Sequence, residues 1–422
     1  MSIPKRFQSI RQAGFTLVEV MIALLIGVIG IVVMMQTFSV SEGFKRTATS
    51  GTDAQINGGV ALYMLEREIR LAGYGMNALM QMGCTSVRVW NSPTNSGVDL
   101  HFVPFEINPA GIPAGDANTD TLMITYGTAD SFVAGVLADQ FPAGTATATT
   151  NFTLTSNWDG FKNGDLFVSV APGAGAGGAA SCVMHEATGT SSAAGNCGTP
   201  SGLGVNILLH GTANYKNPRN GCAMTPPTHN SSTGIKDASG VVVPVVHQSN
   251  GGQIFNMGNP AIKVYAIRGG NLTSCDWVAS DCTVAANYGI LVNDIVSLRA
   301  VYQMNLTPVV NALPGDGIVT PSVAAISGNA FLPSRVMAAT LELTARSSLK
   351  EKPSAGSGTV CDATPVKSRP DRSQDWIYQV GPPAAPIDLS TIPGMPTATD
   401  WSCYRYKMFQ TSVPIRNTIW RP

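Results

Sequence analysis

The sequence is poor in charged residues and lacks the short motifs that mark common enzyme classes. Only 12% of its 422 residues are charged, and 26 basic residues balance 26 acidic ones. Without a basic excess, the composition gives no indication of binding to nucleic acid or anionic lipid. No phosphate-binding loop, HExxH or GxSxG sequence occurs. We therefore expect a non-enzymatic protein without a cofactor, although an enzyme whose catalytic residues are far apart in sequence also lacks such motifs.

Metal-binding patterns are also missing. No CxxC pair occurs, and the histidines are far apart and show no ligand spacing; they are His101, His185, His210, His229 and His247. The segment "DANTD" places Asp116, Asn118 and Asp120 at alternate positions, as at the start of a calcium loop. It lacks the glycine at the sixth position and the glutamate at the twelfth. An Asx-rich turn is therefore preferred to a calcium site, and no metal is expected.

Eight cysteines are present, and all of them follow the apolar N-terminal segment. An even number of cysteines in an exported domain favours disulfide bonds. Two of the expected pairs, Cys275–Cys282 and Cys182–Cys197, close short loops in Gly- and Ser-rich sequence, where the chain can bend. The four expected pairs are Cys275–Cys282, Cys182–Cys197, Cys361–Cys403 and Cys84–Cys222.

The N-terminal segment 15–35 is long and apolar. At about 1.5 Å per residue, a helix of this length crosses a hydrocarbon core of about 30 Å. Lys5, Arg6 and Arg11 precede it, so the positive-inside rule places the N-terminus in the cytoplasm and the bulk of the chain outside. The sequence therefore predicts a single membrane span.

Two ordinary explanations of this segment leave Glu19 unexplained. A secretory signal peptide is one, but the sequence that follows, "QTFSVSEGFKR", has no A-x-A cleavage site. A plain membrane anchor is the other. A carboxylate inside a membrane span costs about 2.5–3.5 kcal/mol on insertion scales and indicates a functional site. Glu19 is therefore the residue that any interpretation of this segment must explain.

The stretch "GFTLVEVMIALLIGVIG" resembles the class III signal of type IV pilins and type II secretion pseudopilins. The resemblance implies that a prepilin peptidase cuts after Gly14 and methylates the new N-terminus at Phe15. Glu19 then becomes the fifth residue of the mature chain. The new amine and Glu19 are oppositely charged, and a buried carboxylate is tolerated when it is paired. The amine of one subunit meeting Glu19 of another would set their axial register, which makes Glu19 an assembly residue.

The helix is expected to continue beyond the membrane through residues 39–75, because no proline interrupts residues 15–72. Apolar residues at spacings of three and four form a stripe, namely Leu62, Leu65, Ile69 and Ala72. Met64 and Leu71 lie on nearly the opposite side, and Gly73 and Gly75 end the helix. One face would pack on the chain's own domain and the other on neighbouring subunits. Alternatively, one domain covers both faces.

The remainder of the chain predicts an antiparallel β-rich domain at 76–422. Apolar residues alternate with polar ones in several stretches, which is typical of half-buried strands; they are "TLMITY", "DLFVSV", "AIKVYAIRGGN", "DIVSLRAVYQM" and "RVMAATLELTAR". Two Gly- or Pro-rich segments, within 172–204 and 381–399, are expected to be surface loops that are either functional or disordered. The predicted fold is α+β, with a leader at 1–14, a span at 15–38 and the helix continuation at 39–75.

"LEREIRLAGYG" and the closing "YKMFQTSVPIRN" resemble PilW-type minor pilins, and the first also resembles the J-type pseudopilin. The resemblance implies a structural subunit that initiates type IV pilus assembly and supports twitching motility, adhesion and DNA uptake. Implied partners are other minor pilins, the major pilin, the inner-membrane assembly platform and a large tip adhesin. The protein would first lie in the inner membrane with its C-terminal domain in the periplasm, and would later be located at or near the pilus tip. Alternatives are a J-type pseudopilin, a tip-binding module and a membrane-anchored enzyme.

Overall fold

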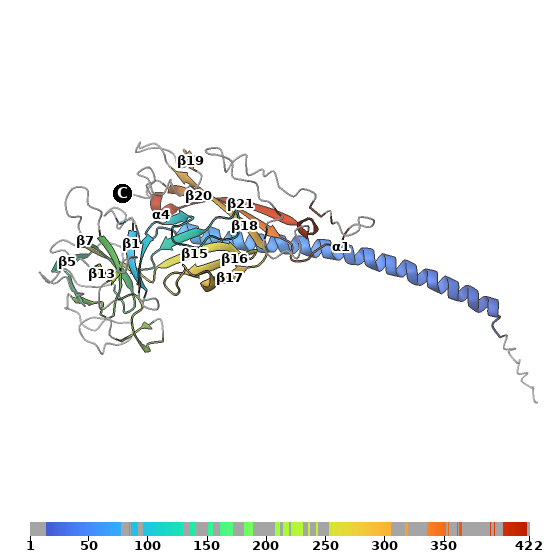
Figure 1. Ribbon diagram of the computed structural model, residues 1–422, viewed down its shortest axis with the longest axis horizontal. Helices are drawn as coiled ribbons and strands as arrows, with labels where there is room; N and C mark the ends of the chain where they lie inside the picture. The colour runs from blue at the N-terminus through green and yellow to red at the C-terminus, as the bar shows by residue number, and fades with distance from the viewer. Residues whose placement is uncertain are drawn as a thin grey trace, which may run out of the picture.

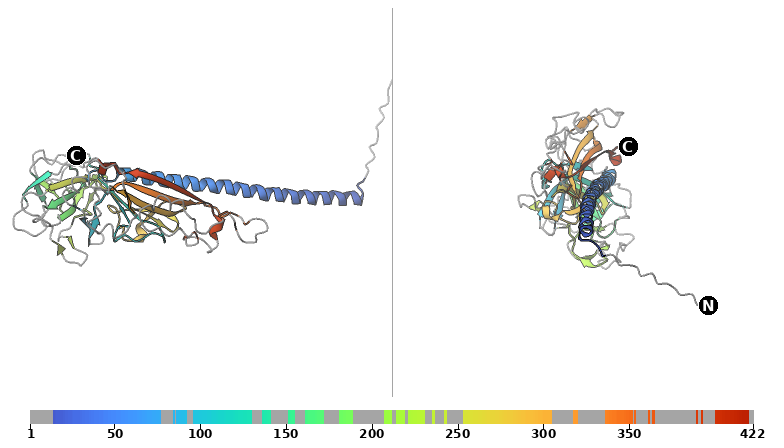
Figure 2. Two further views of the ribbon diagram at one scale, coloured as in Figure 1. Left: turned by 90° about the horizontal axis from the view of Figure 1, so that it is seen from above. Right: turned by 90° about the vertical axis from the view of Figure 1, so that its right-hand side faces the viewer.

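The computed structural model consists of one long helix with a β-rich domain on its C-terminal half (Figure 1). The helix α1, Leu17–Leu71, has 55 residues and is therefore about 80 Å long. Its N-terminal half projects away from the domain (Figure 2). The structure describes residues 14–76, 84, 86–91, 96–129, 136–140, 151–154, 161–171, 181–188, 207–211, 214–218, 221–230, 235–236, 242–243, 253–304, 317–319, 336–351, 353, 361, 363–364, 389, 392 and 400–419.

The described strands and helices after α1 are, in chain order, β1 (Ser86–Asn91), β2 (Ser96–His101), β3 (Phe105–Ile107), β4 (Leu122–Tyr126), β5 (Val136–Gln140), β6 (Asn151–Leu154), β7 (Leu166–Ala171), β8 (Ser181–Glu186), β9 (Ile207–Leu209), β10 (Tyr215–Lys216), β11 (Met224–Thr225), β12 (Ile235–Lys236), β13 (Val242–Val243), β14 (Gln253–Gly258), β15 (Ala261–Arg268), β16 (Asn271–Asp276), η2 (Ala285–Asn287), β17 (Gly289–Val292), β18 (Ile295–Met304), β19 (Gly317–Val319), β20 (Val336–Arg346), η6 (Asp400–Cys403), β21 (Tyr406–Pro414) and α4 (Arg416–Ile419). The α+β fold class predicted from the sequence is confirmed.

Three sheets make up most of the domain. A five-stranded sheet has the order β17-β16-β15-β4-β3, and a four-stranded sheet has the order β19-β18-β20-β21. An eight-stranded sheet, in the order β2-β1-β8-β7-β14-β5-β6-β9, lies at the end far from the projecting helix (Figure 1). The pairings are antiparallel, except that β1 lies parallel to β8. Helix α1 packs against strands of the five- and four-stranded sheets.

The inward face of α1 is the stripe predicted from the sequence. Leu65, Ile69 and Ala72 are fully buried in a core shared with strands of both sheets. Met64 also packs against this core, so the prediction that it lies on the opposite side is wrong; it sits on the flank of the buried stripe. Gly73 ends the helix with a φ of 79°, a conformation that glycine adopts without strain.

The outward face of α1 stays uncovered by the described part of the chain. Ile56, Val60 and Tyr63 are 56%, 46% and 66% exposed. The alternative in which one domain covers both faces of the helix therefore does not fit the described residues. These apolar side chains are available to another molecule.

Strands β4 and β15 are buried on both faces, whereas their alternating sequences predict half-buried strands. Leu122 and Ile124 of β4 point into the core beneath α1, while Met123 points into a second core beneath the eight-stranded sheet. In β15, Tyr265 likewise points into the core beneath α1, and Val264 points into the core beneath the eight-stranded sheet. The five-stranded sheet is thus the middle layer between α1 and the eight-stranded sheet, which the sequence does not reveal.

A polar cluster joins α1 to the middle sheet. Glu68 on α1 accepts a hydrogen bond from Lys263 Nζ at 3.0 Å and another from the Tyr126 hydroxyl at 2.8 Å. Burial and the neighbouring Glu68 carboxylate raise the pKa of the Tyr126 phenol. The phenol therefore stays protonated and keeps donating to Glu68 at physiological pH.

Gly58 allows β21 to approach α1 closely, because a Cβ at this position would lie 2.0 Å from the Phe409 ring. At the adjacent Gly59, a Cβ would meet nothing within 4 Å. We expect Gly58→Ala to destabilise the domain by about 1–3 kcal/mol through overpacking. The control Gly59→Ala should stabilise it by about 0.5–1 kcal/mol. Thermal unfolding of the full chain in detergent, followed by near-ultraviolet circular dichroism, measures both. Equal midpoints for the two variants would contradict this packing.

Two of the expected disulfides are present, Cys275–Cys282 and Cys361–Cys403. The other two expected pairs are wrong, because Cys84 bonds to Cys182 with their Cα atoms 5.9 Å apart. The parallel pairing of Arg88 on β1 with Val183 on β8 brings these two cysteines together across 98 residues of sequence. Cys222 is also disulfide bonded. The eighth cysteine, Cys197, lies outside the described residues.

Candidate processing and assembly site

The predicted cleavage position lies in non-helical backbone immediately before α1. Gly14, Phe15 and Thr16 are not helical, and the Phe15 side chain is 81% exposed. Thr16 is the N-cap of the helix, with φ −76° and ψ 149°. The Gly14–Phe15 peptide bond is therefore accessible and unconstrained by helical hydrogen bonds, as a peptidase requires of its substrate.

Thr16 and Glu19 form half of a capping box. The Thr16 Oγ1 atom accepts a hydrogen bond from the Glu19 backbone N–H at 3.3 Å, and the Thr16 carbonyl accepts from the same N–H at 3.1 Å. The spacing Thr-x-x-Glu is the sequence signal for such a cap, so the cap could have been predicted from the sequence. It places the start of the helix at Leu17 and holds Glu19 in the first turn, where the helix dipole favours a negative charge.

The Glu19 carboxylate accepts no hydrogen bond and makes no ion pair with any residue that the structure describes. It is also the acidic residue of the first helical turn. Cleavage after Gly14 would create an amine at Phe15, about one helical turn away. The carboxylate is therefore free to pair either with the amine of its own subunit or with that of a neighbour.

The side chains around Glu19 have no cover within the described chain. Every residue from Leu17 to Val40 is exposed, and α1 is the one helix among the described residues long and apolar enough to cross a membrane. Apolar surface of this extent is costly in water. It requires lipid or another apolar surface as cover.

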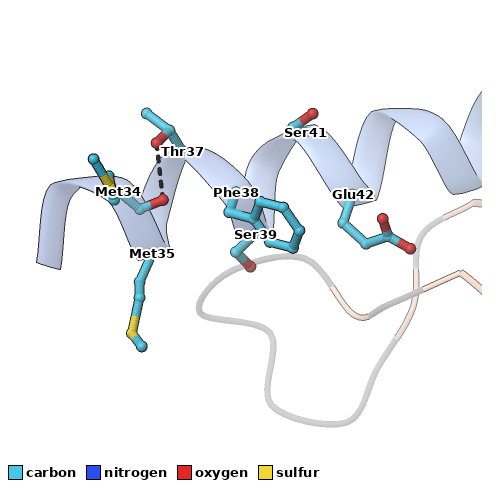
Figure 3. A pocket seen from close by; sticks show the side chains of 7 residues that line it. All are labelled: Met34, Met35, Thr37, Phe38, Ser39, Ser41 and Glu42. Atoms are coloured by element: carbon cyan, nitrogen blue, oxygen red, sulfur yellow. Dashed lines mark hydrogen bonds between the residues drawn. The ribbon is translucent and has the colours of Figure 1, made fainter. Parts of the chain in front are cut away.

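The described lining of the cavity beside the end of the apolar segment does not bring catalytic groups together. Its volume is about 810 Å³, and its described lining is the stretch of α1 from Met34 to Glu42. Figure 3 shows Thr37 and Ser41 on one side of the helix and Met35 on the other. The Thr37 hydroxyl donates back to the Met34 carbonyl at 2.9 Å. This stretch therefore offers no converging set of polar groups.

The acidic residues of "DANTD" serve as hydrogen-bond acceptors for the backbone. Asp116 accepts from the N–H groups of Gly269 and Gly270, and Asp120 accepts from the Ala300 N–H and from Asn108 Nδ2. These contacts fit the predicted Asx-rich turn. The carboxylate oxygens of Asp116 and Asp120 join the turn to the neighbouring strands and do not converge on one point.

The fold brings together two histidines that are distant in sequence. The His185 and His210 rings lie 4.7 Å apart in a buried aromatic cluster with Phe152 and Phe167. His229 lies elsewhere, between the Trp90 and Val278 carbonyls. His247 is outside the described residues. No group of three or more His, Cys, Asp or Glu side chains suited to a metal occurs in the described part of the chain.

Residues 10–35 match the family model described as the prokaryotic N-terminal methylation motif. No curated protein and no solved structure matches the chain. The motif supports a type IV pilin-like or pseudopilin role. Together with the uncovered apolar helix, it indicates a membrane-anchored, pilus-associated protein that meets the pilus-assembly machinery. The match covers Gly14, Phe15 and Glu19 but none of the β-rich domain.

Proposed function

We propose that this chain is a structural minor pilin of the PilW type, which takes part in the initiation and assembly of type IV pili. It supports twitching motility, adhesion and DNA uptake as a component of the filament. Within this proposal the chain is a structural subunit and has no catalytic activity. Its partners are other minor pilins, the major pilin, the assembly platform and a large tip adhesin.

One observation supports this proposal most strongly. The apolar half of α1 is uncovered and carries one carboxylate, Glu19, in its first turn, next to an accessible Gly14–Phe15 bond. A plain anchor needs the apolar surface but not the carboxylate. A subunit that must align with others before it leaves the membrane needs both.

The proposal implies an order of events along one chain. The prepilin peptidase removes 1–14 and methylates Phe15 while α1 spans the inner membrane. The domain meanwhile lies in the periplasm, where its disulfides form. The apolar half of α1 then exchanges lipid for neighbouring helices, and the subunit is placed at or near the tip.

A J-type pseudopilin of a type II secretion system is the second candidate, since it shares the N-terminal signal and the apolar helix. The genes beside this one separate the two functions. Pilus genes support the minor pilin, and secretion genes support the pseudopilin.

The processing step gives the direct test. We expect the protein from native cells to begin at Phe15 and to carry one N-methyl group. N-terminal mass spectrometry measures both features. A Gly14→Leu variant should keep residues 1–14, because the peptidase loses the residue that precedes the cleaved bond, while the control Gly43→Leu should be processed normally. A mature N-terminus beyond residue 35 would indicate an ordinary signal peptide and would refute the proposal.

A further inference from the structure

Strand β17 forms one edge of the five-stranded sheet. It pairs with β16 on one side, and no described strand lies on its other side. Gly289, Ile290 and Leu291 are exposed, Ile290 at 61% and Leu291 at 38%. An edge strand presents backbone N–H and C=O groups that an added strand can pair with. This edge therefore combines backbone groups and apolar side chains.

Two of the features that protect edge strands, charged side chains and proline, are absent here. Natural edges carry charged side chains or proline, which discourage pairing with another chain. Residues 282–293 contain neither. The exposed apolar surface also extends into the preceding loop, where Val284 is 45% exposed and Ala285 is exposed. Two protections remain: β17 is short, and its pairing with β16 shifts register between Leu272 and Thr273, which leaves Leu291 as an extra residue on the β17 side.

The β17 edge is held in place by contacts on its inner side. The Cys275–Cys282 disulfide closes the loop that leads to it. The Arg268 guanidinium lies 4.3 Å from the centre of the Tyr288 ring, and the Tyr288 hydroxyl donates to the Cys282 carbonyl at 2.9 Å. A preformed edge loses little conformational entropy when a partner binds, which favours association.

The edge lies beside the uncovered face of α1. Strand β17 contacts α1, and a row of residues spaced four apart on the helix leads toward the same sheet. The row begins at the exposed Ile56 and Val60, continues through the half-buried Met64, and reaches Glu68, which bonds to Lys263 of β15. A helix packed along this row would bring its own domain close to β17.

We propose that an extended segment in the domain of a neighbouring filament subunit adds to β17 as an antiparallel strand. The proposal rests on the proposed function, because it assumes that the neighbour's helix lies parallel to α1. The partner is a different prepilin-type chain. Two copies joined antiparallel at β17 are related by a two-fold axis perpendicular to the sheet. Because α1 lies on the face of that sheet, rotation about this axis reverses the direction of α1. The apolar halves of the two α1 helices would then point in opposite directions and could not share one membrane.

Site-specific photo-crosslinking in native cells tests the proposal with the full chain. A photoreactive amino acid replaces Ile290. Met224, 55% exposed on β11, serves as an exposed apolar control, and Ile26, 63% exposed in the apolar helix, reports on contacts between helices. We expect the Ile290 probe to form an adduct with a strand segment of a second chain whose own N-terminus carries a prepilin signal. The Met224 probe should form none. Ile290→Lys should reduce recovery of that partner about tenfold compared with Met224→Lys.

The three probes separate the possible failures. Adducts at Ile26 without any at Ile290 overturn this inference and leave the proposed function standing. A chain that retains residues 1–14 and forms no adduct at Ile26 refutes the proposed function itself. An adduct between Ile290 and a second copy of this chain refutes the assignment of the partner.

Discussion

Glu19→Leu should leave the protein stable, inserted and processed, yet prevent it from joining its pilin partners. The substitution removes the cost of inserting a carboxylate, which reaches about 2.5–3.5 kcal/mol for a charge at the centre of a span, so the amount in the membrane should not fall. It also removes the carboxylate that pairs with an N-terminal amine, and breaking a buried pair typically costs about 3–5 kcal/mol. At about 1.4 kcal/mol per factor of ten, partner recovery should fall at least about a hundredfold. Co-purification after cross-linking measures recovery, and electron microscopy measures piliation.

Glu42 provides a matched control on the same helix. It pairs with Arg46 at 3.4 Å, one turn further on, at the surface of α1. An exposed pair of this kind contributes about 0.3–0.5 kcal/mol, so Glu42→Leu should change partner recovery by less than about threefold. Glu19→Asp keeps the charge and should be milder than Glu19→Leu. Normal recovery and normal piliation with Glu19→Leu would mean that Glu19 has no role in assembly.

Loss of the Cys84–Cys182 disulfide should be the largest single loss of domain stability. The bond closes a loop of 98 residues, and the chain-entropy relation assigns such a loop about 4.7 kcal/mol. We expect the double variant Cys84→Ser, Cys182→Ser to lose about that much free energy of unfolding. Urea unfolding in detergent, followed by tryptophan fluorescence, measures it, since the buried Trp277, one of the six tryptophans, shares a core with both cysteines.

The Cys275–Cys282 bond is the natural comparison, because it belongs to the same core but has a sequence separation of 7. The same relation gives about 2.4 kcal/mol for this loop. The variant Cys275→Ser, Cys282→Ser should therefore lose about half as much stability. Equal losses would show that local packing, and not loop length, decides what each bond contributes.

Features encoded by neighbouring residues could be predicted from the sequence. The absence of proline and the spacing of Leu65, Ile69 and Ala72 predict both the length of α1 and its buried face. The alternation in "TLMITY" and "RVMAATLELTAR" places β4 and β20 within a residue of their observed bounds. Gly73 and Gly75 end the helix where their conformational freedom is needed.

Features that depend on distant pairing could not be predicted in this way. The parallel contact of β1 with β8 decides the partner of Cys84, and nothing near either cysteine encodes it. Met123 is buried because the eight-stranded sheet covers the second face of β4. The Thr16 cap is different, since its signal is local and was present in the Thr-x-x-Glu spacing. At the candidate site, the residues were predicted from the motif, and the structure adds the exposure of Phe15 and a Glu19 carboxylate that has no partner among the described residues.

The uneven support along α1 has a mechanical consequence. The domain packs against the helix from about Ala54 to Ala72. The described residues leave the projecting part uncovered from Leu17 to Val40, a stretch that includes Gly27 and Gly30, neither of which would bring a Cβ near another group. Each glycine weakens a helix by about 0.5–1 kcal/mol relative to alanine. Under tension along the long axis, the projecting part should yield first, extending from about 1.5 Å toward about 3.3 Å per residue. The projecting part of α1 would then lengthen under a sudden force, and the strands of the domain would stay paired while it does so.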